Sequence, residues 1–212
     1  MLNTVLQNLL SLPKLLTTHN MENLFNKETI VVNQKFTIIN NEYQILDESG
    51  AEIGFVKEQS SALETVLKLF MSKKMLPWRM DILGPQKNVL ISISKGLTFF
   101  LSKISVKNSA GTEIAQIKQK FALKPKFDVC DTSGAVIASV EGNFVAWDFK
   151  INDAQGNQIG SINKQFGGLA KEIFTDSDKY VVKINNSISD PNLRSAVISA
   201  ACIVDKVLKE RD

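Results

Sequence analysis

The chain of 212 residues is long enough for one domain with a substantial core, and its 44% hydrophobic and 22% charged residues are globular values. The formal net charge of +3 is too small to indicate a nucleic-acid partner, although it permits attraction to an anionic surface. One histidine and two cysteines provide too few ligands for a zinc site, and nothing demands a disulfide, so a reducing, cytoplasmic location is expected.

The N-terminal stretch MLNTVLQNLLSLPKLL shows helical spacing of its apolar residues. They are Leu2, Val5, Leu6, Leu9 and Leu10. The stretch lacks the positively charged start of a secretory signal, and Pro13 interrupts it. We expect residues 1–27 to form an amphipathic helix and a linker, which either packs on the domain or contacts a membrane interface. Residues 28–212 are then the folded domain.

A hairpin pattern recurs along the chain. Its turns read DESG, NSAG, DTSG and DAQG and end in Gly50, Gly111, Gly134 and Gly156. The opening Asp or Asn can accept hydrogen bonds from its own turn, and glycine adopts a positive φ without a Cβ clash. Apolar residues at every second position then indicate strands with one buried face. A divergent copy around GPQK places Trp78 on the position of Trp147, which favours packing of both rings at a barrel end.

The segment SALETVLKLFMSKKM, residues 61–75, carries an apolar stripe at helical spacing. The stripe contains Leu63, Val66, Leu67, Phe70 and Met71. We expect a helix here that packs on the outside of the barrel or closes one of its ends.

The connection IKQKFALKPKF is the densest basic stretch of the chain. It contains Lys118, Lys120, Lys124 and Lys126. One interpretation is a solvated loop, and the other is contact with anionic lipid. If the protein touches a membrane, we expect this stretch to make the contact.

The C-terminal helix is expected over residues 191–209, with Asp190 as its N-cap and Pro191 at its first position. Apolar residues fall on every side, and such a helix is buried in protein or in lipid. Its uncharged run from Ser195 to Val204 is about 15 Å long, whereas a membrane span needs about twenty residues. We therefore expect no transmembrane segment and place this helix inside the protein.

The hairpins and three further strand-like runs amount to about twelve strands with one apolar face. So many strands cannot remain one open sheet, and a barrel of this size has space for a slim helix. The expected fold is mainly β: a closed antiparallel barrel of about twelve strands, built from repeated hairpins, that encloses the hydrophobic C-terminal helix.

Three stretches carry a resemblance to a known family: VVNQKFTIINNEYQILDESGAEIGFVKE (31–58), AWDFKINDAQGNQIGSINKQFGGLAKEIFTDSDKYVVKI (146–184) and LRSAVISAACIVDKVLKE (193–210). The chain resembles the phospholipid scramblase-related proteins, most closely their bacterial branch, which are related to LURP-one-related proteins and to the tubby C-terminal domain. The resemblance implies a twelve-stranded barrel around a central hydrophobic helix, the tubby C-terminal-like fold.

The resemblance also bears on calcium. An acidic segment of the eukaryotic scramblases has been proposed to bind this ion, and Asp176 and Asp178 match its opening pair. Asn and Ser occupy most of the later acidic positions, so the resemblance implies a weak calcium site at most. The alternative is a structural turn before the last strand, with no cofactor.

The functional hypothesis is a non-enzymatic binding module that recognises anionic phospholipid headgroups or a protein partner, peripherally at the inner membrane surface. One alternative is scramblase-like lipid transfer with weak calcium dependence, and another is a barrel enzyme that processes a small ligand. A Ser/His/Asp relay is not expected, because the single histidine, His19, lies in the expected linker. The apolar central helix predicts a filled and dry bore, which argues against an interior active site.

Overall fold

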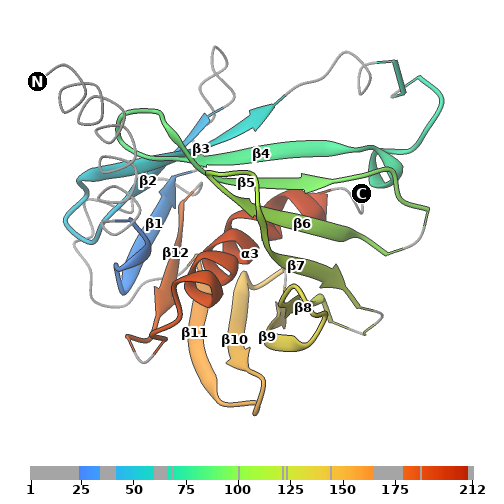
Figure 1. Ribbon diagram of the computed structural model, residues 1–212. Helices are drawn as coiled ribbons and strands as arrows, with labels where there is room; N and C mark the ends of the chain where they lie inside the picture. Colours follow the sequence, from blue (N-terminus) through green and yellow to red (C-terminus); the bar gives the residue numbers. More distant parts are fainter. Residues whose placement is uncertain are drawn as a thin grey trace, which may run out of the picture.

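The computed structural model describes residues 24–33, 42–59, 66–67, 69–99, 101–120, 122, 124–143, 145–164, 179–186 and 188–209. Twelve strands form a closed antiparallel barrel in which neighbours along the chain are neighbours in space, and β1 pairs with β12 to complete it (Figure 1). The strands are β1 (Thr29–Asn33), β2 (Glu42–Leu46), β3 (Glu52–Gln59), β4 (Trp78–Leu83), β5 (Val89–Lys95), β6 (Lys103–Asn108), β7 (Glu113–Gln119), β8 (Lys126–Cys130), β9 (Val136–Asn143), β10 (Asp148–Asp153), β11 (Gln158–Asn163) and β12 (Lys179–Ile184). The predicted barrel is therefore confirmed.

The connections between strands alternate between two ends of the barrel, because each strand is antiparallel to both neighbours. At one end, which we call the turn end, tight turns join β2–β3, β4–β5, β6–β7, β8–β9 and β10–β11. At the other end, which we call the loop end, the remaining connections join β1–β2, β3–β4, β5–β6, β7–β8, β9–β10 and β11–β12. The central helix α3 (Pro191–Lys209) begins at the turn end, directly after β12.

The predicted turn chemistry is present at the turn end. The four turn glycines have φ values of 84°, 80°, 89° and 88° at Gly50, Gly111, Gly134 and Gly156. The side chain of Asn108 accepts hydrogen bonds from two amides of its own turn, at 3.1 Å and 3.0 Å, and the opening aspartates do the same. In the divergent fifth turn Lys87 takes the glycine position with φ 62°, and its amide donates to the Gly84 carbonyl at 2.9 Å. The fifth hairpin is therefore confirmed.

Helix α3 lies within the barrel, as predicted. The side chains of Ala196–Val204 are buried around the whole circumference of the helix. They form one apolar cluster with inward residues of the strands, such as Ile117 and Val140. Asp190 is the N-cap, because its Oδ1 accepts a hydrogen bond from the Asn192 amide at 2.9 Å.

Arg194 fastens the start of α3 to the turn end of the barrel. Its side chain donates to the carbonyls of Phe25, Lys27 (2.5 Å) and Asn185 (3.2 Å), which lie before β1 and after β12. Burial lowers the pKa of the Arg194 guanidinium, and the charge of Glu28 partly opposes this effect. The guanidinium thus donates to three carbonyls where the chain enters and leaves the barrel, and the carbonyl of Asn185 also accepts from the Ile188 amide at 3.2 Å.

The β3–β4 connection differs from its sequence prediction. Residues 60–65 and 68 lie outside the described residues. Of the described residues of the predicted stripe, Phe70 is 80% exposed and Val66 is 55% exposed, whereas Leu67 and Met71 are half-buried. The amides of Phe70 and Met71 both bond to the Leu67 carbonyl, and Ser72 is extended at ψ 150° before the short 3₁₀ helix η1 (Lys73–Met75). The extended backbone at Ser72 ends this helical hydrogen bonding directly after Met71.

Candidate functional site

Three of the four predicted lysines lie toward the loop end: Lys126 begins β8, and Lys120 and Lys124 lie in the connection between β7 and β8. Lys118 belongs to β7, but its ammonium lies beside the β8–β9 turn, 3.9 Å from the Cβ position of Gly134. Lys120 forms an ion pair with Asp128 at 3.4 Å, and Lys126 forms one with Glu141 at 3.2 Å. Within the described part of the chain, Lys124 has no ion pair, and its side chain is exposed.

A half-open surface pocket of about 330 Å³ contains two of these lysines. It is lined by Ala122, Lys124, Lys126, Glu141, Gly142, Asn143, Asp148 and Lys150. Lys150 was not predicted from the sequence, because strand alternation only indicates that it points outward. The register that pairs Glu141 with both Lys126 and Lys150 brings the two lysines to either side of one carboxylate.

Gly142 forms the floor of this pocket. A Cβ atom at this position would lie 2.1 Å from the Asp148 carbonyl oxygen, so only glycine permits β9 and β10 to approach as they do. Its amide donates to the Pro125 carbonyl at 3.2 Å, which ties the β7–β8 connection to the same place. The pocket therefore forms where backbone contacts hold β9, β10 and the β7–β8 connection together.

The pocket lysines can hold an anionic group. Three ammonium groups, of Lys124, Lys126 and Lys150, surround a space that also carries the carboxylates of Glu141 and Asp148. A phosphate can accept hydrogen bonds from the ammonium groups, and the carboxylates can accept them from an amine on the same molecule. The pairing of Lys126 with Glu141 leaves Lys124 and Lys150 as the cations most available to a ligand.

Charge is distributed unequally between the two ends. Among the described residues in the tight turns and directly beside them, most ionisable side chains are acidic: Glu28, Asp47, Glu48, Glu52, Glu113, Asp131, Asp153 and Asp190, with Lys27, Lys87 and Arg194 as the cations. Among those in the loop-end connections and directly beside them, most are basic: Lys73, Lys74, Lys95, Lys103, Lys120, Lys124, Lys126, Lys164 and Lys179, with Glu42 and Asp148 as the carboxylates. The basic crossover is therefore part of a basic end.

Both tryptophans pack at the loop end, as predicted. Trp147 stacks on Tyr180 with 5.6 Å between ring centroids and meets Phe149 edge-on at 6.1 Å. Trp147 has a φ of 48°, which is uncommon for a non-glycine residue, and the Lys164 ammonium lies 4.3 Å from its ring. Trp78 is 6% exposed below the β3–β4 connection. These rings close the barrel near the basic residues rather than forming an exposed platform.

The predicted calcium ligands Asp176 and Asp178 lie outside the described residues, so the calcium site stays a prediction. Within the residues that the structure does describe, no three His, Cys, Asp or Glu side chains are grouped in a way that could hold a metal ion. Cys130 and Cys202 are both free and buried, and burial raises the pKa of the Cys202 thiol to about 12. Among the described helices, none has both the length and the apolar character required to cross a membrane.

Comparison with known proteins identifies the family. The sequence profile named Scramblase matches residues 6–211, which is nearly the whole chain. The chain belongs to the scramblase family. The predicted resemblance is thus confirmed at the level of the family, and the narrower likeness to its bacterial branch stays a prediction.

Two curated relatives are similar to this scramblase-family chain at low identity. A phospholipid scramblase family protein of Schizosaccharomyces pombe is 21% identical over 89% of this chain and 56% of its own length. The Saccharomyces cerevisiae protein named altered inheritance rate of mitochondria protein 25 is 21% identical over 77% of this chain and 60% of its own length. The chain therefore spans less than two thirds of either relative.

A solved structure shares the fold of this scramblase-family chain. The crystal structure of an Arabidopsis thaliana protein superposes with a TM-score of 0.51 at 11% sequence identity, covering 84% of this chain and 90% of that one. At this identity the likeness concerns the fold alone.

Proposed function

We propose that this scramblase-family protein is a non-enzymatic module that binds the anionic phospholipid headgroups of a membrane surface through its loop end, as a peripheral protein of the inner membrane surface. Family membership supports a lipid-related role. The finer assignment to headgroup binding rests on the charges and the pocket described above.

The observation that carries the proposal is the separation of charge between the two ends. A protein with a basic end and an acidic end is oriented by the field of an anionic surface before contact. Each lysine close to such a surface contributes about 1 kcal/mol to binding. The loop-end lysines therefore supply both the orientation and much of the affinity, while the carboxylates of the turn end are kept away from the lipid.

The pocket adds a place for one headgroup. Lys124, Lys126 and Lys150 all line this surface pocket, so a lipid phosphate that approaches from the outer surface meets three ammonium groups. The interior of the barrel is occupied by α3, whose buried side chains are mainly apolar. This arrangement supports recognition on the outside of the barrel rather than chemistry within it.

Sedimentation with vesicles tests this function. We expect the protein to bind vesicles of mixed phosphatidylserine and phosphatidylcholine, to bind phosphatidylcholine alone much less, and to lose affinity as salt is added, because surface charges are screened. In the double variant Lys124→Gln/Lys150→Gln we expect affinity for the mixed vesicles to fall about 30-fold, since two lysine contributions total about 2 kcal/mol.

The matched control removes the same charge from the opposite half of the barrel. Lys107 and Lys183 lie near the turn-end termini of β6 and β12, and both are exposed. The double variant Lys107→Gln/Lys183→Gln should bind as the wild type does. Equal loss in both double variants would show that net charge alone matters, and no binding at low salt would remove the lipid proposal in favour of a protein partner.

A further inference from the structure

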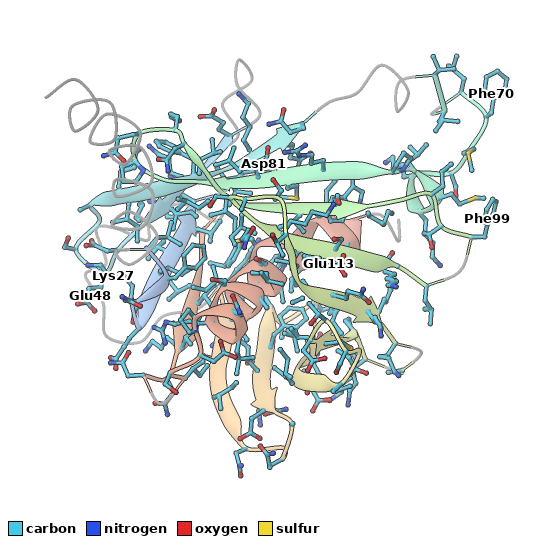
Figure 2. The ribbon with its side chains drawn as sticks, in the orientation of Figure 1. Lys27, Glu48, Phe70, Asp81, Phe99 and Glu113 are labelled. Carbon is cyan, nitrogen blue, oxygen red and sulfur yellow. The ribbon has the colours of Figure 1, made fainter. Side chains whose placement is uncertain are left out.

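Two neighbouring loop-end connections project exposed apolar side chains. In the β3–β4 connection Leu69 is 78% exposed and Phe70 is 80% exposed. In the β5–β6 connection Leu97 is 51% exposed and Phe99 is 70% exposed. Figure 2 shows Phe70 and Phe99 pointing away from the barrel on one side, whereas Lys27 and Glu48 lie on the opposite side. We call Leu69, Phe70, Leu97 and Phe99 the apolar tip.

We propose that the apolar tip inserts into the interfacial layer of a lipid bilayer and anchors the loop end there. This inference rests on the membrane binding proposed above and names the part of the protein that enters the lipid. Large exposed apolar side chains on a surface otherwise rich in charge mark a site of interaction. Aromatic and leucine side chains gain free energy when they leave water for the boundary between headgroups and acyl chains.

The charges around the apolar tip favour a bilayer as its partner. Lys73, Lys74 and Lys103 are exposed beside it. The described residues of the two connections, 66–67, 69–77, 96–99 and 101–102, include no carboxylate. Apolar side chains with lysines around them match a membrane whose acyl region lies directly below anionic headgroups. The basic crossover follows in the next connection of the same end, so both can face one surface.

In the β3–β4 part of the apolar tip two backbone amides are already hydrogen-bonded, which lowers the cost of moving this part out of water. The Leu69 amide donates to the Val66 carbonyl at 3.2 Å, and the Phe70 amide donates to the Leu67 carbonyl at 3.0 Å. A polar backbone group that loses water without a partner is strongly unfavourable in lipid. The apolar residues at the tip can therefore enter the interface without leaving these amides unsatisfied.

The two connections are also held to one another and to the barrel. The Thr98 amide donates to the Met75 carbonyl at 3.2 Å, which joins the β5–β6 connection to the β3–β4 connection. The ammonium of Lys95, 2% exposed, donates to the Lys74 carbonyl at 2.9 Å. Because these bonds order the tip before it meets a membrane, less conformational entropy is lost on binding.

Quenching by brominated lipid chains tests insertion. Phe99→Trp places a fluorophore in the tip, and Trp78 and Trp147, which are buried, provide the same background in every protein. With mixed phosphatidylserine and phosphatidylcholine vesicles we expect a blue shift and quenching of the new tryptophan. The matched control is Val136→Trp, at a residue 44% exposed at the turn end, which should show neither change.

A second variant measures the contribution of the apolar tip to affinity. Phe70→Ser/Phe99→Ser should fold normally, because both rings are exposed, and should bind the mixed vesicles at least tenfold more weakly. The remaining binding should keep its salt dependence, because the lysines are intact. This result differs from that of the Lys124→Gln/Lys150→Gln variant, which should weaken the preference for anionic lipid and keep the quenching of Phe99→Trp in the fraction that is bound.

Three results would overturn the proposal. If Phe99→Trp sediments with vesicles but is not quenched, the lysines bind the surface and the apolar tip stays outside, so headgroup binding alone survives. If the wild type does not bind vesicles at all, both proposals fail. If Phe70→Ser/Phe99→Ser binds vesicles normally and instead converts a dimer to a monomer in sedimentation velocity, the tip is an interface between two copies of the chain.

Discussion

The same strands form both ends of this barrel, but the described residues at the two ends differ in hydrogen bonding, exposure and charge. At the turn end, each tight connection satisfies its own backbone, and Arg194 holds the start of α3 to the carbonyls around it. At the loop end, apolar side chains such as Phe70 remain exposed and lysines predominate among the described residues. The groups that stabilise the fold and the groups available for binding are therefore separated along the barrel.

This separation has a physical basis. A turn such as that of Asp131 and Gly134 has its hydrogen bonds within itself, so it needs neither a partner nor a particular neighbour. Most loop-end connections are longer in sequence than the tight turns, and two of them expose apolar side chains such as Phe70 and Phe99 to water. Substitutions at the loop end can therefore change binding with little effect on stability, whereas those at the turn end should do the reverse.

The largest difference is expected between the two ends of α3. Arg194→Met removes donors from three carbonyls in a buried place, so the free energy of unfolding should fall by about 2–4 kcal/mol. Lys206→Met removes the partly exposed ion pair with Glu58 (2.7 Å) at the loop end, and we expect a loss below about 1 kcal/mol. Urea unfolding measures the free energy of unfolding of both variants. Equal losses would show that the two ends of α3 contribute equally to stability.

An intermediate effect is expected for two glycines that have no atom within 4 Å of an added Cβ. Gly156 lies at the turn end with φ 88°, so Gly156→Ala should cost about 1–2 kcal/mol through backbone conformation alone. Gly96 lies at the loop end without a positive φ, and Gly96→Ala should be neutral or stabilise by up to about 1 kcal/mol. Thermal unfolding of the two variants checks this. A destabilised Gly96→Ala would show that the loop end requires glycine at this position, as the turn end does at Gly156.

The smallest effect concerns pH. The hydroxyl of Ser133 lowers the pKa of the Asp131 carboxyl, and the side chain of Asn157 lowers that of Asp153, both from the ordinary value of 3.8. Because the folded pKa is below the unfolded one, the stabilisation is complete above pH 3.8 and is lost as pH falls through the lowered pKa. Asp131→Asn/Asp153→Asn keeps an acceptor oxygen in each turn, as Asn108 does, but should lose this part of the acid sensitivity.

Urea unfolding of the wild type and the double variant at neutral and at acid pH measures this effect. The stability advantage of the wild type should shrink as pH falls below 3.8. The two aspartates of the unfolded chain bind protons there first, and those of the folded protein bind protons only at lower pH. An advantage that stays constant with pH would show that the turns depend on hydrogen bonding alone and not on the negative charge of the turn end.

Much of the fold could be predicted from the sequence because its signals are local. Gly111 after Asn108 specifies a turn within four residues, and the all-round apolar character of 195–204 specifies a buried helix. The candidate site was predictable only in part. Lys124 and Lys126 stood out as a basic run, but Lys150 joins them through strand register, which a single isolated strand does not reveal.

The prediction for the stripe of residues 61–75 failed for a related reason. The spacing of Val66 and Phe70 fits a helix face, and a helix face is usually packed, so the sequence predicts a helix that packs on the outside of the barrel or closes one of its ends. Whether such residues pack depends on where the backbone stops being helical, and here extended backbone at Ser72 ends the helical geometry. The exposed fractions that identify this surface are a property of the assembled barrel.

The hairpins, the barrel they form and the helix inside it follow from the sequence alone, because each depends on contacts between residues close in the chain and on the need to bury apolar faces. The lysine pocket, the apolar side chains left in water and the unequal charge of the described residues at the two ends follow only from the assembled fold. These features depend on register and on the alternation of connections between two ends, and both arise only when all strands are in place.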